Sequence, residues 1–184
     1  MKKILLIISV VIILALGYGA YFFLYATRQH SPLDNVTYSQ NGLVMSVDYS
    51  RPYKKGRILF GSDEEALQPN DEYWRLGANA ATKFTTNRQL SIEGNKLEPG
   101  SYTIYTIPGE TAWKIGFNTD WDRWGLPPPD YEDDLFRIES TPLTTAELME
   151  QFTVTFENSS EGTTIYLIAS WGNTQIRIPM EEVN

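Results

Sequence analysis

The sequence predicts an all-β fold, an antiparallel two-sheet sandwich of the jelly-roll kind, preceded by one N-terminal transmembrane helix. Short segments in which apolar and polar residues alternate recur along most of the chain, about eight to ten of them, as in β-sandwiches. Turn signals such as Asn41-Gly42 and Pro108-Gly109 separate these segments. A long uncharged run near the N-terminus predicts the helix.

The N-terminal segment predicts a membrane anchor. Lys2 and Lys3 precede an uncharged, mainly apolar run over residues 4–27, and about 20 apolar residues suffice to cross a bilayer as a helix. A cleaved signal peptide is the alternative, because residues 17–20 are mostly small, but Tyr18 fits a cleavage site poorly and aromatic residues continue the run. We favour the anchor. Since basic residues stay on the cytoplasmic side, we expect one pass through the cytoplasmic (inner) membrane, an N-terminus in the cytoplasm and a domain on the outer, periplasmic side.

Composition divides the chain into an anchor over residues 1–27, a polar connector over residues 28–34 and one β-domain over residues 35–184. With 42% hydrophobic and 13% aromatic residues, the chain has enough apolar surface for a packed core. The sequence contains no cysteine, which excludes disulfides, thiol catalysis and cysteine metal sites.

The first hairpin is predicted from residues 36–39 and 43–49, which Asn41-Gly42 joins, because this dipeptide strongly favours a two-residue turn. The apolar face of its second strand consists of Leu43, Met45, Val47 and Tyr49. Further strands are predicted over residues 57–60, 83–86, 89–93, 101–107, 111–118, 135–139, 152–156, 163–169 and 174–179. One helix is predicted, over residues 144–149, because Thr144 and Glu147 have the spacing of a capping box.

The segment over residues 49–82 is too irregular for a plain strand or helix and carries the best candidate site. Its candidate ligand-binding residues are Arg57, Trp74, Arg75, Asn79 and Thr82. A guanidinium can donate two hydrogen bonds to one carboxylate or phosphate, an amide both donates and accepts, and an indole offers a flat apolar face. These side chains therefore suggest a small anionic ligand.

The same segment also has a structural interpretation. Arg75 would then pair with an internal acid such as Asp134, while Gly77 and Asn79 would only permit a tight bend. A basic cluster over residues 51–57 has two interpretations as well: it forms an anion site or a lipid-headgroup contact, or it is a solvated loop beside Pro52.

Residues 119–134 lack the alternating pattern of the predicted strands and contain tryptophans, three consecutive prolines and several acids. Trp124 and Tyr131 complete the set of candidate ligand-binding residues, because aromatic rings stack on sugars while neighbouring carboxylates accept hydroxyl hydrogens. In the alternative interpretation the rings close one end of the sandwich. The acids suggest calcium only weakly, since their spacing differs from that of an EF-hand loop.

The sequence predicts no cofactor, metal site or catalytic residue, and favours a non-enzymatic role. The only histidine is His30, in the connector, which makes a histidine-based triad implausible. Phosphate-binding loops, nucleophile elbows and dinucleotide fingerprints are absent from the sequence. A net charge of −8 repels phosphate backbones, so nucleic acid is not an expected partner.

Several motifs occur together in the domain: Gly56-Arg57, Phe60-Gly61, Trp74-Arg75-x-Gly77-Ala78-Asn79-x-Ala81-Thr82, Leu97-x-Pro99-Gly100-x-Tyr102, Ile107-Pro108, Trp113 with Asn118, and Asp134-x-x-x-Arg137. In combination they resemble a bacterial family called domain of unknown function 2911. The resemblance covers residues 31–179, essentially the whole domain. It implies an exported protein and carries no assigned reaction.

Three functions are compatible with these features. The favoured one is a ligand- or partner-binding module of the cell envelope, held in the membrane by residues 4–27, with a small anionic or carbohydrate ligand or an envelope protein as its partner. A hydrolase acting on an envelope polysaccharide or ester would use the carboxylates of Asp130, Asp133 or Asp134. A purely structural envelope component is the third.

Overall fold

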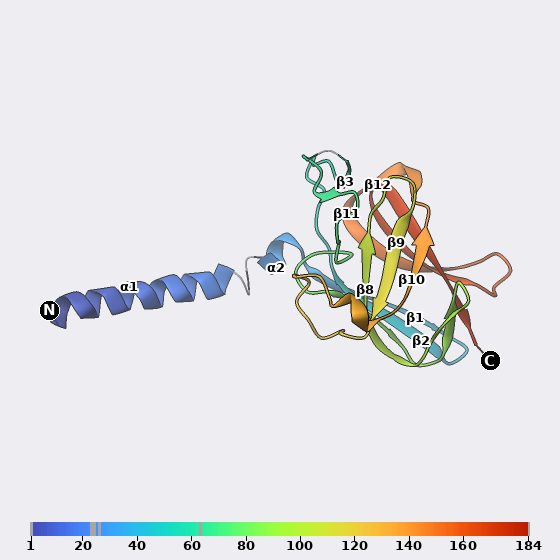
Figure 1. Cartoon of the computed structure of the whole chain (residues 1–184), viewed down its shortest axis with the longest axis horizontal. Helices are drawn as coiled ribbons and strands as arrows, with labels where there is room; N and C mark the ends of the chain where they lie inside the picture. The colour runs from blue at the N-terminus through green and yellow to red at the C-terminus, as the bar shows by residue number, and fades with distance from the viewer. Residues whose placement is uncertain (1, 23–24, 26, 63, 184) are drawn as a thin grey trace.

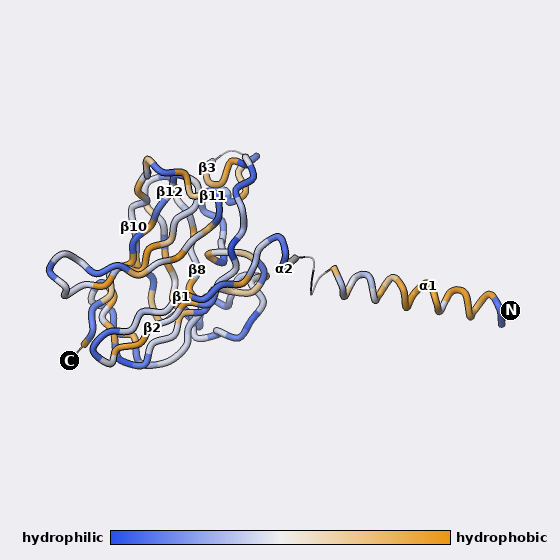
Figure 2. Tube along the Cα trace, turned by 180° about the vertical axis from the view of Figure 1, so that it is seen from behind, coloured by the Kyte–Doolittle hydropathy of each residue, from blue (hydrophilic) through white to orange (hydrophobic). Residues whose placement is uncertain are grey.

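A computed structural model describes residues 2–22, 25, 27–62 and 64–183. Helix α1 (Lys2–Tyr21) extends away from a β-domain, and the short helix α2 (Thr27–His30) lies beside that domain (Figure 1). By length and composition α1 can cross a membrane, as a signal sequence also can. Hydrophobic residues recur along the whole of α1 in Figure 2. Residues 1, 23, 24 and 26 of the predicted anchor lie outside the described residues.

The predicted hairpin is confirmed, although its first strand begins earlier than expected. Strand β1 (Leu33–Gln40) pairs antiparallel with β2 (Leu43–Ser50), and Gln40 lies opposite Leu43. Asn41 and Gly42 both have positive φ, 51° and 82°, as the tight hairpin turn requires. The side chains predicted for one face of β2 are all buried in the core.

Two antiparallel sheets form the predicted sandwich. The larger sheet has the order β1-β2-β5-β8-β9-β10 and the smaller has the order β11-β12-β6-β7. The remaining strands of the larger sheet are β5 (Thr82–Thr86), β8 (Gly100–Ile107), β9 (Trp113–Asn118) and β10 (Asp134–Ser140). Those of the smaller sheet are β6 (Leu90–Ile92), β7 (Asn95–Leu97), β11 (Leu143–Asn158) and β12 (Ile165–Glu182).

The core lies between the two sheets because their strands alternate inward apolar and outward polar residues. Met45, Phe84, Ile104 and Phe117 of the larger sheet and Leu167, Ile178 and Met180 of the smaller sheet are buried members of one cluster. This burial is the main source of stability for a fold of this kind.

The helix predicted over residues 144–149 is wrong, because this segment belongs to strand β11. Thr144 pairs with Thr174 of β12 and Met149 pairs with Gly172, with a register shift between the two pairs. The Asn173 amide donates to the carbonyl oxygen of Thr145 at 3.1 Å and so supports the irregular part. Six residues with one capping signal form an unstable helix, whereas pairing with β12 at Thr144 and Met149 holds both ends of the segment in the sheet.

Two other boundaries differ from the prediction. The strand expected over residues 57–60 is reduced to β3 (Phe60–Gly61), which pairs parallel with β4 (Gln68–Pro69). The strands expected over residues 163–169 and 174–179 are one continuous strand, β12. Its irregular point is Gly172, with φ 62°. A bulge can change the register there without ending the strand.

Replacement of Gly77 by any residue with a side chain is expected to destabilise the fold. Gly77 has φ +146°, and a Cβ atom would lie 2.8 Å from the Ser50 carbonyl oxygen. We expect Gly77→Ala to lower the free energy of unfolding by about 2–3 kcal/mol, from backbone strain and from this contact. Urea denaturation of the full chain in detergent measures the loss. Gly94→Ala is the control, because Gly94 also has positive φ but a Cβ there meets nothing within 4 Å. Equal losses in the two variants would refute the steric argument.

Candidate functional site

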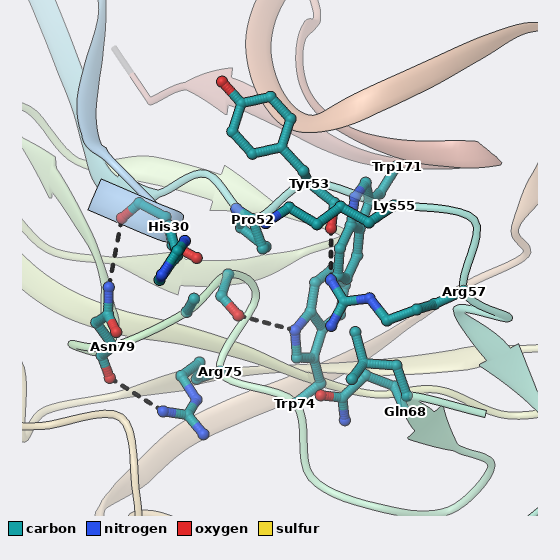
Figure 3. A pocket seen from close by; sticks show the side chains of 14 residues that line it. His30, Pro52, Tyr53, Lys55, Arg57, Gln68, Trp74, Arg75, Asn79 and Trp171 are labelled. Carbon is teal, nitrogen blue, oxygen red and sulfur yellow. Dashed lines mark hydrogen bonds between the residues drawn. The ribbon is translucent and has the colours of Figure 1, made fainter. Parts of the chain in front are cut away.

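A pocket of about 470 Å³ lies where the chain leaves α2 and enters the sandwich. Its walls come from residues 30–31, the turn around residues 52–57, residues 67–68, the segment 74–79 and Trp171 of β12. His30, Arg75 and Asn79 lie on one side and Lys55 and Arg57 on the other, with Trp74 between them (Figure 3). Four of the predicted site residues, Arg57, Trp74, Arg75 and Asn79, therefore meet at one pocket.

The lining of the pocket is basic. His30, Lys55, Arg57 and Arg75 contribute to it, and no aspartate or glutamate is among the described lining residues. This contrasts with a chain whose net charge is −8. Local positive charge in an acidic protein attracts anions to one place.

Arg75 is a cation with no carboxylate partner among the described ion pairs. It is partly buried, and its Nη1 donates to the Asn79 carbonyl oxygen at 3.1 Å. Burial lowers the pKa of the Arg75 guanidinium, nearby Tyr73 opposes this, and Arg123 lowers the pKa further. Arginine remains protonated at any physiological pH. A bound anion would therefore relieve the unfavourable environment of Arg75.

The basic cluster predicted over residues 51–57 separates into two roles. Arg51 is structural: it pairs with Asp34 at 3.1 Å, and its Nε donates to the Phe152 carbonyl oxygen at 3.0 Å. Arg57 bonds its own turn, where its Nε donates to the Lys54 carbonyl oxygen at 3.0 Å. The Arg57 and Lys55 side chains are exposed at the pocket.

The floor of the pocket is aromatic. Trp74 and Trp171 stack with ring centroids 5.7 Å apart and an interplanar angle of 17°. Both rings belong to the core cluster, and Trp74 Nε1 donates to the Gly77 carbonyl oxygen at 3.1 Å. Trp171 Nε1 is buried and has no hydrogen-bond partner among the described residues. A buried indole N–H without a hydrogen-bond partner is uncommon in folded proteins.

Asn79 joins three parts of the chain. Its Nδ2 donates to the Ser31 carbonyl oxygen at 3.3 Å, next to α2. Its own carbonyl oxygen accepts from Arg75 and from the Gly125 backbone N–H, the latter at 3.0 Å. Asn79 has φ 60°, a region that asparagine tolerates better than most residues. The residue thus shapes the pocket as well as lining it.

The other three predicted site residues do not line this pocket. Thr82 is fully buried, and its hydroxyl donates to the Leu76 carbonyl oxygen at 2.6 Å, which makes it structural. Trp124 forms an isolated bridge with Ala80. Tyr131 stacks on Tyr105 with centroids 5.7 Å apart.

Asp134 belongs to a separate network and does not pair with Arg75. Its carboxylate accepts from the Tyr105 hydroxyl at 2.6 Å, from Asn118 Nδ2 at 2.8 Å and from Arg137 Nε at 2.7 Å. Burial, and then the Asp134 carboxylate, raise the pKa of the Tyr105 phenol, while Arg137 lowers it. The network satisfies the hydrogen-bonding groups of side chains on β8, β9 and β10, so we assign it a structural role.

The acids of residues 130–134 cap a short turn or belong to the Asp134 network. Among the described residues, no group of three or more histidine, aspartate and glutamate side chains is arranged to hold a metal ion. The Asp130 carboxylate accepts from the Glu132 backbone N–H at 2.9 Å, as the N-cap of a 3₁₀ turn over Tyr131–Asp133. None of these acids lines the basic pocket.

Sequence patterns missed several contributors to the pocket, among them His30 and Trp171. His30 was assigned to the connector alone, and Trp171 lies between the two strands predicted over residues 163–169 and 174–179. Nothing in the local sequence places either residue beside Arg75, because β12 and α2 are distant from it along the chain.

Comparison with known proteins identifies the family to which the domain belongs. No curated protein and no solved structure matches the chain. The family described as "protein of unknown function (DUF2911)" matches residues 31–180, which span most of the chain and all of the sandwich except the last two residues of β12. The chain therefore belongs to the family of proteins of unknown function DUF2911.

Proposed function

We propose that the domain is a ligand-binding module of the cell envelope whose basic pocket takes a small anion bearing an apolar or aromatic group. The observation that carries the proposal is a lining with three arginine or lysine side chains and one histidine and without an acid among the described residues. Arginine and lysine donate charge-assisted hydrogen bonds to carboxylate, phosphate or sulfate oxygens.

The apolar part of the ligand would contact the aromatic floor. Trp74 and Trp171 are among the lining residues, and Leu67, Pro52 and Tyr53 add apolar atoms to the lining. A volume of about 470 Å³ is within the range of small-molecule sites, which combine apolar walls with a few polar groups. An inorganic anion alone would leave much of this surface uncovered.

The proposal includes the place where the module works. Helix α1 would remain as an anchor in the cytoplasmic membrane, with Lys2 and Lys3 in the cytoplasm and the domain outside. The pocket would then open close to the outer membrane surface, because His30 and Ser31 line it. The absence of cysteine is compatible with an oxidising compartment, since a core of this size needs no disulfide.

Phenyl phosphate is a suitable probe because it combines a dianion with an aromatic ring. Isothermal titration calorimetry of the full chain in a nonionic detergent should detect one site for phenyl phosphate. Inorganic phosphate should bind more weakly, and phenol should show no binding. This order follows because both the charge and the ring make contacts in the pocket.

Removing a pocket cation should weaken this binding. We expect Arg75→Met, which retains most of the aliphatic stem, to raise the Kd for phenyl phosphate about tenfold or more, because a hydrogen bond to a charged group contributes about 1.5–3 kcal/mol. Lys55→Met should act in the same direction. The control is Lys96→Met, which removes an exposed lysine of β7 that does not line the pocket. Binding unchanged in Arg75→Met, or no binding of any anionic probe, would contradict the proposal.

A further inference from the structure

We infer that residues 119–127 dock on the bilayer that holds α1, with Trp121, Trp124 and Leu126 inserted among the lipid headgroups. This inference rests on the part of the proposed function in which α1 stays in the membrane, and it does not depend on occupancy of the pocket.

Hydrogen bonds place this loop beside the point at which the chain leaves the anchor. Ser31, directly after α2, accepts from Asn79, and Asn79 in turn accepts from the Gly125 backbone N–H. Trp124 bridges the neighbouring Ala80. In Figure 1 the same loop lies on the side of the sandwich that faces α1.

The tether is short. Nine residues, 22–30, separate the end of α1 from Ser31, and the last four of them are helical. A chain extends at most about 3.5 Å per residue, and a helix about 1.5 Å. The loop is therefore kept within a few tens of ångströms of the end of α1 and can reach the bilayer.

The loop exposes large apolar side chains at closely spaced positions. Trp121 is 43% exposed, Trp124 is 38% exposed and Leu126 is 50% exposed. Tryptophan is enriched at membrane interfaces because its ring is apolar and its N–H is polar. Three such side chains in six positions, next to a membrane tether, fit a lipid surface better than bulk water.

Charge decides which lipid surface is expected. The loop contains Asp120 and Asp122, and Arg123 pairs with Asp120 at 3.2 Å. The loop thus carries two acids against one base, which gives it no attraction of its own to anionic headgroups. The docking would therefore depend on apolar insertion and would not require an anionic lipid.

The tryptophans allow a direct test. All five, Trp74, Trp113, Trp121, Trp124 and Trp171, belong to the β-domain, and α1 has none. The full chain is reconstituted in phosphatidylcholine vesicles with brominated acyl chains, which quench indole fluorescence at short range. We expect quenching in the natural sequence and its loss in the Trp121→Phe/Trp124→Phe variant, because the other three rings are buried.

A matched control moves one tryptophan to the far end of the sandwich. Glu161→Trp, made in the double variant, lies in the turn after β11. The neighbouring Asn158 bonds Gln40, at the end of β1 opposite to α2. This variant should show no quenching. Unquenched fluorescence in the natural sequence, or equal quenching at position 161, would overturn the inference. Phenyl phosphate binding should be unchanged in the double variant, so failure of docking and failure of the pocket proposal are separate results.

Discussion

Trp74→Ala should lower the free energy of unfolding by about 3–5 kcal/mol, the usual cost of truncating a large aromatic side chain in a core. Trp74 is 3% exposed and contacts four aromatic rings, those of Phe60, Trp113, Phe152 and Trp171. Its indole N–H also holds the turn at Gly77. Loss of the side chain removes apolar contacts on two sides of the core and releases the segment that carries Arg75.

Chemical denaturation of the full chain in detergent measures this loss, and thermal melting should show a fall of about 10 °C or more. Trp74→Phe is the matched variant, because it keeps a ring in the core and loses the N–H. It should cost clearly less than the alanine change. A stability loss below about 1 kcal/mol for Trp74→Ala would show that the ring is not part of the packed core.

Asp134→Ala should cost about 3 kcal/mol of unfolding free energy. The substitution leaves the Tyr105 hydroxyl, the Asn118 amide and the Arg137 guanidinium without their shared acceptor. Each unsatisfied buried donor costs about 1–3 kcal/mol. The Asp134 side chain is 7% exposed, but that of Arg137 is 36% exposed. Water can therefore solvate the arginine, and the total loss of unfolding free energy stays below three times the cost of one unsatisfied donor.

Asp133→Ala is the control, because it removes a neighbouring exposed carboxylate. A change within about 0.5 kcal/mol is expected there. The same denaturation measurement serves both variants. Equal effects at positions 133 and 134 would mean that the buried network does not stabilise the sandwich. Phenyl phosphate binding should survive Asp134→Ala under conditions in which the variant is folded, since Asp134 does not line the pocket.

Local pattern predicted most of the strands, and it failed where a strand is irregular. The alternation of β2 was clear because one face of this strand is buried by the opposite sheet, whereas residues 102–106 of β8 are all buried, on both faces of the strand. Residues 144–149 were predicted to be helical from a capping box. Their place in β11 could not be predicted locally, because it depends on pairing with residues of β12 that lie more than twenty positions later. The strands predicted over residues 163–169 and 174–179 are likewise one strand, which continues through Gly172.

The pocket was only partly predictable. Arg57, Trp74, Arg75 and Asn79 were identified because arginine, tryptophan and asparagine in an irregular segment suit ligand contact. Their exposure was not predictable. Trp74 lies in the core while Arg57 reaches solvent. Trp124 and Tyr131 were grouped with them by residue type, but loop 119–130 contacts the segment at Asn79 and Ala80 without lining the pocket.

The sequence alone determined the fold class, the apolar helix at the N-terminus and the types of side chain at the candidate site, because periodicity and composition are local properties. Only the tertiary structure decided which of those side chains meet. It separated Arg75 from Asp134, joined Arg75 with His30 and Lys55, and placed Trp171 beneath them. The physical reason is that hydrogen bonding and burial between sheets set these contacts, and their partners are far apart in the chain.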